Sequence, residues 1–441
     1  MATRSFSAAG ARALLRAPAV HTYAVVGLSA LAQFATTVLL ARVAGPAVVG
    51  DFALAITTAN LLTGLALLGL DRIMVRELGG DLRHGDTARA RRIVRQLALT
   101  VALAAIAIAL VYLGVINSPL GDRLGGDRAA MALAAGIVIV WPLLRLGRSV
   151  LRATGSAVLS QLTQEVPPIL KFAAIGAMVL AGFAPTAGQL TGLSLLLYGG
   201  CAIWVWWLSA RFVRSWPRGG PAPDPRLRLA GLSMMSVLFL QTFTQWFVLA
   251  QLSATGTSDE VGVFRVAAQV AGIVATITQT TEFYVAPRMA GDFRAGRHDL
   301  AWRRQRRGTV AMLLLSAPVL LVAFLAPSAF LGLLFGPEFV AGAAALSIVA
   351  FAQLVNALRG PIGAFLSMSG NDHWQLGLTI ASVALAVGLG LWLIPAMGVT
   401  GAAIAYSAAF LLRSIGSAIV AWRLVPRHAA PPAEPPAPDE E

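Results

Sequence analysis

The sequence has little charge for its length. Only 12% of its 441 residues are Asp, Glu, Lys or Arg, whereas 57% are hydrophobic. A soluble protein typically has about 25% charged residues. Apolar stretches recur along almost the whole chain, and each is long enough to cross the ~30 Å hydrocarbon core of a bilayer. The sequence therefore predicts an all-α integral membrane protein and excludes a soluble fold.

Cysteine is nearly absent, and so are recognisable catalytic motifs. The single cysteine, Cys201, lies in an apolar run, so no intrachain disulfide can form and no thiol chemistry is indicated. The sequence has no phosphate-binding glycine loop, no cluster of metal ligands and no nucleophile–histidine–acid set. We therefore expect no cofactor, no metal and no enzymatic activity.

The apolar stretches predict about twelve transmembrane helices. The first follows three arginines, but it is too long for the core of a signal peptide and another span follows it at once. The predicted spans are residues 19–41, 52–70, 97–116, 130–147, 166–183, 188–209, 230–252, 261–283, 309–326, 341–358, 375–394 and 401–422. The Pro-rich, acidic end of the chain, residues 429–441, is expected to be a disordered cytoplasmic tail.

Positive charge is concentrated in alternate connecting segments. Of the 34 Lys and Arg residues, 29 lie in segments that we assign to the cytoplasm, and only Arg42, Arg123 and Arg128 lie in segments that we assign to the outside. By the positive-inside rule, this asymmetry predicts a multi-pass protein of the cytoplasmic (inner) membrane with both termini in the cytoplasm. Because orientation accounts for the net charge of +14, we expect no nucleic-acid partner.

The chain contains an internal repeat at a spacing of 212 residues. The matched pairs include Gln33 with Gln245, Phe52 with Phe264, Arg76 with Arg288, and Arg91, Arg92 and Arg95 with Arg303, Arg304 and Arg307. The repeat spans six helices, so both halves enter the membrane from the same side, as in parallel-repeat transporters. We predict an N-terminal six-helix lobe (1–215) and a C-terminal six-helix lobe (216–428), related by an axis along the membrane normal.

Polar residues concentrate in four spans that form equivalent pairs under the repeat: 19–41, 52–70, 230–252 and 261–283. Polar groups in hydrocarbon are costly and usually face a cavity or another helix. The alternative for each residue is a hydrogen bond that joins two helices. The pattern favours a central substrate-binding cavity that contains Arg265, Gln33, Gln241, Gln245, Asn60 and Gln269. The nearly pure apolar spans, 97–116 and 309–326, are expected to face lipid.

Arginines near the inner helix ends form a second set. Arg145 and Arg148 share one helix face with Arg152. We predict a cytoplasmic mouth for an anionic substrate, formed by Arg72, Arg76, Arg145, Arg148 and Arg288. The alternatives are positive-inside anchoring and lipid headgroup contact, and for Arg265 the alternative is snorkelling to the outer interface. Glu165 and Glu282 lie near the inner side of the membrane, and either could carry a proton.

Three motifs point to a known family. They are Val43-Ala-Gly-Pro-Ala-Val-Val-Gly-Asp-Phe, Gly69-Leu-Asp-Arg and Leu393-Ile-Pro-Ala-Met-Gly-Val-Thr-Gly-Ala-Ala-Ile-Ala. In their order and spacing they resemble the polysaccharide and O-antigen flippases, which belong to one superfamily with the multidrug and toxin extrusion transporters and the lipid II flippase. The resemblance implies two lobes that open alternately to either side. It also implies transfer of an isoprenoid-diphosphate-linked oligosaccharide to the outer leaflet, for lipopolysaccharide O-antigen or another surface polysaccharide.

The chain departs from this family in the seventh helix. Members often carry an Asp there, where this chain has Gln245-Trp-Phe-Val-Leu, so cation coupling through that helix is in doubt. The expected partners are the lipid-linked oligosaccharide, membrane lipids and other polysaccharide-assembly proteins. A multidrug or organic-cation antiporter is the first alternative, although the middle regions of the spans lack the carboxylate that a cation needs. A membrane glycosyltransferase or polymerase is the second, although the predicted outer loops are too short for a catalytic domain.

Overall fold

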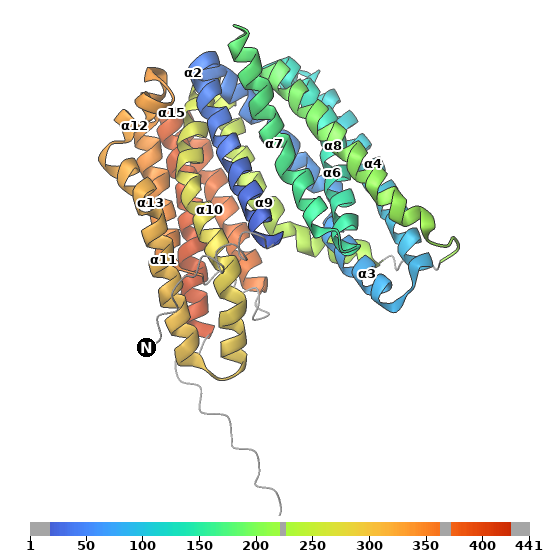
Figure 1. Ribbon diagram of the computed structural model, residues 1–441. Coiled ribbons are helices and arrows are strands. Elements are labelled where there is room, and N and C mark those ends of the chain that lie inside the picture. Colours follow the sequence, from blue (N-terminus) through green and yellow to red (C-terminus); the bar gives the residue numbers. More distant parts are fainter. Residues whose placement is uncertain (1–17, 221–225, 362–371, 425–441) are drawn as a thin grey trace, which may run out of the picture. The chain divides into compact units, whose positions relative to one another are not determined.

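In the computed structural model, every regular element of the described residues is a helix (Figure 1). The structure describes residues 18–220, 226–361 and 372–424. In chain order, the helices are α2 (Pro18–Leu67), α3 (Leu70–His84), α4 (Thr87–Ile116), α5 (Pro119–Leu124), α6 (Arg128–Ala153), α7 (Ala157–Leu180), α8 (Ala187–Ser215), α9 (Arg226–Thr255), α10 (Ser258–Arg294), α11 (His298–Leu325), α12 (Pro327–Leu334), the 3-10 helix η1 (Pro337–Gly342), α13 (Ala343–Arg359) and α15 (Asp372–Leu424). The predicted tail at residues 429–441 and the arginines before residue 18 lie outside the described residues.

Helices α2 and α15 each contain two spans. They run for 50 and 53 residues, whereas about 20 helical residues cross a bilayer core. Each helix is interrupted at a glycine with positive φ: Gly45 at 78° and Gly398 at 53°. Glycine adopts such angles without the steric cost that a Cβ imposes, and next to Gly45 the ring of Pro46 also fails to continue the helical hydrogen bonds. The resemblance motifs at 43–52 and 393–405 therefore mark the two places where one span turns into the next.

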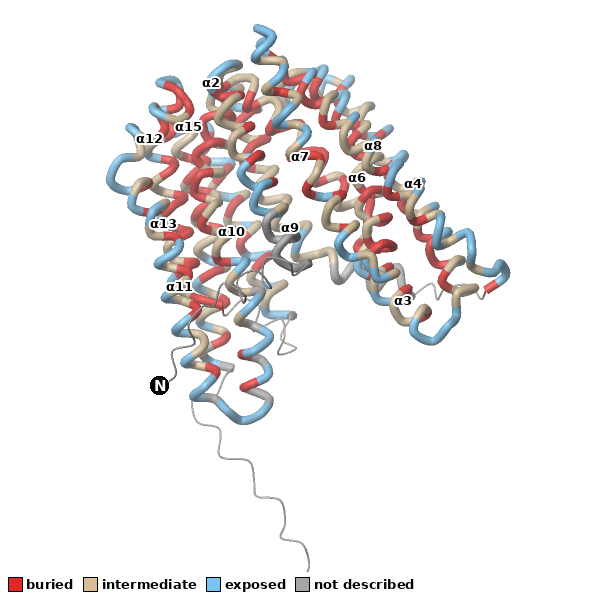
Figure 2. The backbone as a smooth tube through the Cα atoms, viewed as in Figure 1, coloured by how far each residue is buried: buried red, intermediate tan, exposed pale blue. Residues whose placement is uncertain are grey.

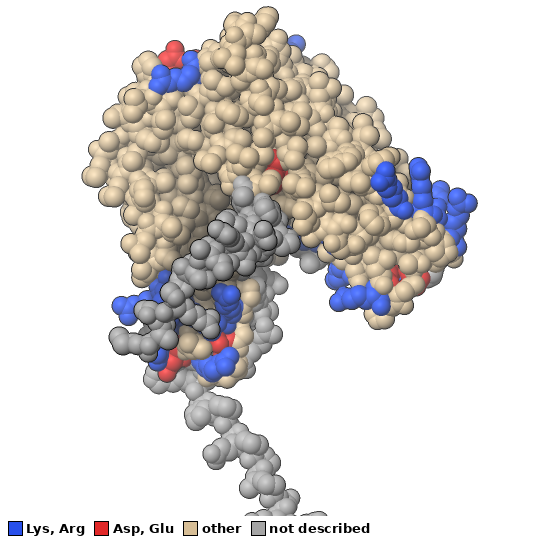
Figure 3. All heavy atoms as spheres, viewed as in Figure 1, with Lys and Arg blue, Asp and Glu red and all other residues tan. Residues whose placement is uncertain are grey.

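The described residues contain nine helices that are long and apolar enough to cross a membrane. Since α2 and α15 each hold two spans, and α7 supplies one more, the chain has twelve spans. The predicted all-α, twelve-helix membrane fold is confirmed. In Figure 3, the Lys and Arg side chains of the visible face gather near its edges, and the surface between them carries almost none.

The chain divides into two compact units, Met1–Gly262 and Val263–Glu441. In the first unit, α6 packs against α4 and α8, and α2 packs against α6, α7 and α9. Small residues allow the close α6–α8 contact, because a Cβ at Gly136 would meet the Leu195 side chain at 2.7 Å. The predicted lobe boundary falls at Ser215, the last residue of α8. The division into lobes at that residue stays a prediction.

In the second unit, α13 packs against α11 and α15. Figure 2 shows exposed residues along the outer sides of the long helices in both units. On α4 the exposed apolar residues include Leu99, Leu103 and Leu110, and on α11 they include Leu314 and Leu321. These faces agree with the expectation that the spans at 97–116 and 309–326 contact lipid.

The helix order of the first half recurs in the second. Helix α4 begins at Thr87 and α11 begins at His298, which reproduces the repeat spacing to within one residue. The halves differ at some of the joints between helices. In the first half, Leu68 and Gly69 have φ of 51° and 69° and separate α2 from α3, whereas α10 continues through the matching positions. The recurrence supports an internal repeat, and its predicted axis stays a prediction.

Candidate functional site

The first unit contains a cavity of about 470 Å³. This volume lies within the range of small-molecule sites, ~300–1,000 Å³. Five helices, α2, α3, α6, α7 and α8, supply its walls. The lining residues are Gln33, Asp71, Trp141, Leu144, Arg145, Arg148, Arg152, Thr163, Gln164, Glu165, Pro168 and Tyr198.

Three arginines on α6 give the cavity its charge. They are spaced by three and four residues, so they lie on one face of the helix. Arg145 donates from Nη2 to Oδ1 of Asn60 on α2 at 2.8 Å, and Arg148 donates to the Gln164 side chain on α7. Arg148 Nε is buried and has no hydrogen-bond partner among the described residues. A buried N–H without a partner is a donor available to a ligand.

The acidic residues of the cavity do not neutralise these arginines directly. Glu165 is buried and accepts a hydrogen bond from Gln161 Nε2 at 2.7 Å. Asp71, in the first turn of α3, also lines the cavity. No carboxylate of the described residues lies within 4.0 Å of a guanidinium nitrogen of the three arginines. Three positive and two negative side chains leave a net positive cavity, so an anion fits it better than a cation.

Helix α7 also presents backbone acceptors to the cavity. Pro167 and Pro168 lie inside this helix and have no N–H. The carbonyl groups of Thr163 and Gln164, four residues earlier, therefore lack their intrahelical donors. Both residues line the cavity. Thr163 is fully buried and Gln164 is exposed, so the Gln164 carbonyl is the one that can accept a hydrogen bond from a hydroxyl group of a bound molecule.

An aromatic pair completes the wall. The rings of Trp141 and Tyr198 meet edge to face, with centroids 5.2 Å apart. Both residues line the cavity. Aromatic faces offer an apolar contact surface, while the tyrosine hydroxyl and the indole N–H supply polar tips. The site thus combines guanidinium groups, amides, free carbonyls and aromatic rings in one pocket.

The structure brings together four of the residues predicted from the sequence. Gln33 lines the cavity with Arg145 and Arg148, and Asn60 holds Arg145. The sequence predicted Arg145 and Arg148 as part of a cytoplasmic mouth, and in the structure they line the same cavity as Gln33. The sequence reasoning missed Trp141, Thr163, Gln164 and Tyr198. The adjacent prolines at 167 and 168 were the available signal for α7, because paired prolines free two carbonyls within a span.

Other predicted residues lie elsewhere. On α9, Gln241 and Gln245 are half-buried and do not line this cavity. On α3, Arg72 and Arg76 are exposed, and Arg76 pairs with Glu77 at 3.0 Å. Arg265, Gln269 and Arg288 belong to α10 and all three lie in the second unit. Arg265 is near Tyr406, and Arg288 is exposed. Their participation in a shared cavity or mouth stays a prediction.

The second unit has its own buried polar network. Arg359 Nη2 lies 2.7 Å from Glu282 Oε1, and Arg359 Nη1 donates to Ser417 Oγ at 2.9 Å. Nearby, Asn356 donates to Thr278 at 3.2 Å. These contacts join α10, α13 and α15. Glu282, a candidate proton carrier in the sequence, is therefore held in an ion pair.

The fold can be compared with solved structures. An inward-facing multidrug resistance MATE family transporter of the MOP superfamily matches with a TM-score of 0.71 and 15% identity, over 90% of this chain and 94% of that one. The chain has the fold of MOP-superfamily transporters. The lipid II flippase MurJ, in an inward closed conformation, matches with a TM-score of 0.71 and 9% identity, over 91% of this chain and 87% of that one. A MOP superfamily transporter from Pyrococcus furiosus, described as having a binding pocket of reverse polarity, matches with a TM-score of 0.55 and 16% identity, over 92% of this chain and 96% of that one.

No protein-family model and no curated protein sequence matches the chain. At these identities the structural matches define the MOP fold and leave the substrate open. The resemblance to polysaccharide flippases therefore remains a prediction for this chain. The chemistry of the cavity provides the basis on which a substrate class can be chosen.

Proposed function

We propose that the protein is a flippase that moves an isoprenoid-diphosphate-linked oligosaccharide across the cytoplasmic membrane for surface polysaccharide synthesis. The observation that carries the proposal is the cavity with Arg145, Arg148 and Arg152, none of which is ion-paired to a described carboxylate. An unpaired, partly buried guanidinium is expensive unless a bound anion compensates it. The sequence resemblance points to the same substrate class.

The diphosphate would bind the arginine face of α6. A guanidinium presents its donors in a planar fork that matches two phosphate oxygens, so it binds a phosphate more specifically than an ammonium group does. Arg148 Nε is already free to donate. In this proposal Asn60 and Gln164 hold the two arginines in place, and the diphosphate receives their remaining N–H groups.

The sugars would bind the opposite walls. Hydroxyl groups of a sugar need acceptors and donors, which the Gln164 carbonyl and the Gln33 amide supply. The apolar face of a sugar ring can lie against Trp141 or Tyr198. The isoprenoid tail stays in the bilayer, because transferring it into a polar cavity would forfeit its hydrophobic burial.

Two structural neighbours illustrate the choice of substrate within this fold. One is described as a multidrug transporter and one as a lipid II flippase. The cavity arginines favour an anionic substrate over an organic cation. Asp71 and Glu165 are the features that would serve a cation, so the antiporter alternative is kept as an outcome of the test.

The test is transport by the purified full-length protein in liposomes, with a fluorescent isoprenoid-diphosphate oligosaccharide as substrate. Substituting Arg145→Gln and Arg148→Gln together removes two charged donors, and we expect the initial rate to fall roughly 100-fold. Arg145→Lys with Arg148→Lys should recover only part of the rate, because an ammonium lacks the fork. Arg123→Gln, an exposed site on α5, is the matched control and should keep the wild-type rate.

An unchanged rate in the double glutamine variant would overturn the proposal. A rhodamine-type organic cation provides the second arm. Proton-driven transport of that cation by the wild-type protein, without transport of the oligosaccharide, would establish the antiporter instead. Thermal unfolding of each variant in detergent checks that the variant is folded, so that a lower transport rate does not come from misfolding.

A further inference from the structure

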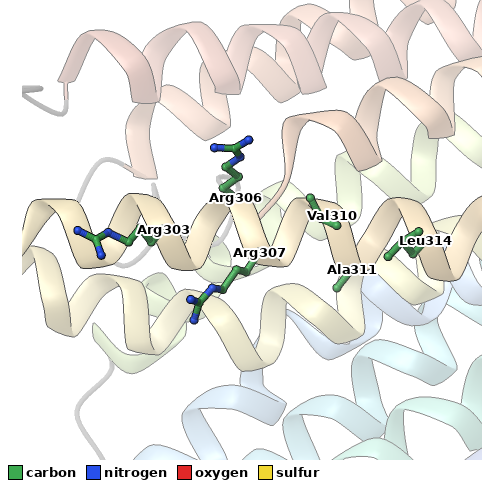
Figure 4. A pocket seen from close by; sticks show the side chains of 6 residues that line it. All are labelled: Arg303, Arg306, Arg307, Val310, Ala311 and Leu314. Atoms are coloured by element: carbon green, nitrogen blue, oxygen red, sulfur yellow. The ribbon is translucent and has the colours of Figure 1, made fainter. Parts of the chain in front are cut away.

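A ridge of three exposed arginines lies on the first turns of α11. Arg303, Arg306 and Arg307 border an open pocket of about 470 Å³ whose remaining walls are apolar: Val310, Ala311 and Leu314 (Figure 4). We call these six residues the α11 ridge. Leu314 has 70% of its surface exposed and Val310 has 49%. An apolar helix flank with this exposure needs an apolar neighbour.

The ridge arginines are available for binding. At this end of the second unit, Asp292 pairs with Arg297 at 3.0 Å and with Arg304 at 3.1 Å. No carboxylate of the described residues lies within 4.0 Å of Arg303, Arg306 or Arg307. Asp292 is therefore paired with arginines outside the α11 ridge, and the ridge keeps three uncompensated positive charges.

The spacing along the helix separates the polar end of the ridge from its apolar end. Positions 303, 307, 310 or 311, and 314 recur every three or four residues and so share one helix face. From Arg303 to Leu314 the helix rises about 16 Å. One leaflet of the hydrocarbon core is about 15 Å thick. A molecule bound along the ridge would thus have an anionic end at the membrane surface and an apolar part that extends into the leaflet.

We propose that the α11 ridge binds an anionic phospholipid of the bilayer, with its phosphate on the arginines and an acyl chain along Val310, Ala311 and Leu314. Charge complementarity selects an anionic headgroup, and the apolar half selects a lipid over free phosphate. The site lies on the side of the membrane that the charge distribution predicts to be cytoplasmic. The proposal is independent of the transported substrate.

The matching positions in the first half carry less available charge. Arg91, which matches Arg303, donates from Nη1 to the carbonyl of Trp216 at 2.5 Å and so holds the segment that follows α8. Val94 stands at the position that matches Arg306, and Arg95 matches Arg307. We therefore assign one high-affinity lipid site to α11 and none of comparable affinity to α4.

The experiment uses the purified full-length protein and native mass spectrometry with added phosphatidylglycerol. We expect the triple variant Arg303→Gln, Arg306→Gln, Arg307→Gln to lose affinity for this lipid by roughly 10- to 100-fold. A control variant, Arg83→Gln, Arg211→Gln, Arg214→Gln, removes the same charge from exposed sites in the first unit and should change the affinity less than twofold. Phosphatidylcholine should bind the wild-type protein as weakly as phosphatidylglycerol binds the triple variant.

A second variant tests the apolar half. Ala311→Trp fills the open pocket beside the α11 ridge and leaves all three arginines, so it should also weaken phosphatidylglycerol binding. This variant provides the test if the triple variant does not fold. Equal loss in the α11 and control variants would overturn the proposal, because the effect would then be one of net charge. The proposal would also fail if an isoprenoid diphosphate, and not phosphatidylglycerol, depended on the ridge, since the ridge would then be an entry site for substrate.

Discussion

Partly buried arginines serve different purposes in the two units. In the first unit, Arg145 and Arg148 face a cavity and are held by neutral amides, those of Asn60 and Gln164. In the second unit, Arg359 is held by the carboxylate of Glu282. An amide fixes a guanidinium without cancelling its charge, whereas a carboxylate cancels it. The identity of the partner thus separates an arginine that can bind an anion from one that joins helices.

The largest expected effect on stability comes from breaking the pair in the second unit. Glu282→Gln leaves the Arg359 guanidinium without its counter-charge, and we expect a loss of about 3 kcal/mol in the free energy of unfolding. Both side chains are mostly buried, at 18% and 13% exposed, so solvent cannot compensate the loss. Denaturant titration in detergent would measure it.

Two variants control this prediction. The double substitution Glu282→Met with Arg359→Met removes both charges and should recover most of the lost stability, because an apolar pair of similar size can replace a buried ion pair. Arg145→Gln in the first unit should cost much less stability than Glu282→Gln. If Arg145→Gln destabilises as strongly as Glu282→Gln, the distinction between the two kinds of arginine is wrong.

The sequence predicted the architecture better than the site. The lengths of the apolar stretches predicted the membrane spans, because the bilayer imposes a minimum length on any helix that crosses it. The repeat located matching helix starts such as Thr87 and His298. The joints at Gly45 and Gly398 lay inside motifs quoted for the resemblance, but composition alone does not show that a glycine takes a positive φ.

The site was predicted only in part, because side-chain partners depend on packing. The spacing of Arg145, Arg148 and Arg152 identified a helix face, but the choice between lipid headgroup and cavity needed α7 and α8 beside it. Tyr198 was missed because a single aromatic residue in an apolar span carries no signal of its own. The ion pair of Arg359 with Glu282 was not predicted, because the two residues lie 77 positions apart in the chain and only packing brings them together.

An intermediate effect should separate sugar binding from diphosphate binding in the first unit. Trp141→Ala removes the ring that packs against Tyr198 and faces the cavity. We expect about a tenfold loss of affinity for the oligosaccharide-linked lipid, equal to about 1.4 kcal/mol, and less than a twofold change for the isoprenoid diphosphate without sugar. Titration of both ligands by native mass spectrometry gives the ratio. Equal losses for the two ligands would show that Trp141 shapes the whole cavity and does not contact sugar.

The smallest effect concerns a carboxylate that lies outside the spans and is paired less favourably than Glu282. Asp81 on α3 is buried and accepts a hydrogen bond from Arg89 at 3.0 Å, yet its second oxygen has no partner among the described residues. Burial raises the pKa of Asp81 above its usual value of 3.8, and the attraction of Arg89 only partly opposes this rise. Folding therefore favours the protonated carboxyl. That contribution to stability is present below the unfolded pKa and is lost as the pH rises through the higher folded pKa.

At pH 7 the charged Asp81 thus carries a net cost, and Asp81→Asn should change the free energy of unfolding by less than about 1 kcal/mol, in the stabilising direction. The difference between variant and wild type should shrink as the pH falls towards 4, where the wild-type carboxyl also becomes neutral. Denaturant titrations at the two pH values measure the difference, and Asp299→Asn, at an exposed acid in the first turn of α11, is the control variant. A clear loss of stability in Asp81→Asn at pH 7 would mean that the Arg89 pair outweighs the cost of burial. Asp81 would then belong with Glu282, among the carboxylates that stabilise the protein by pairing with an arginine.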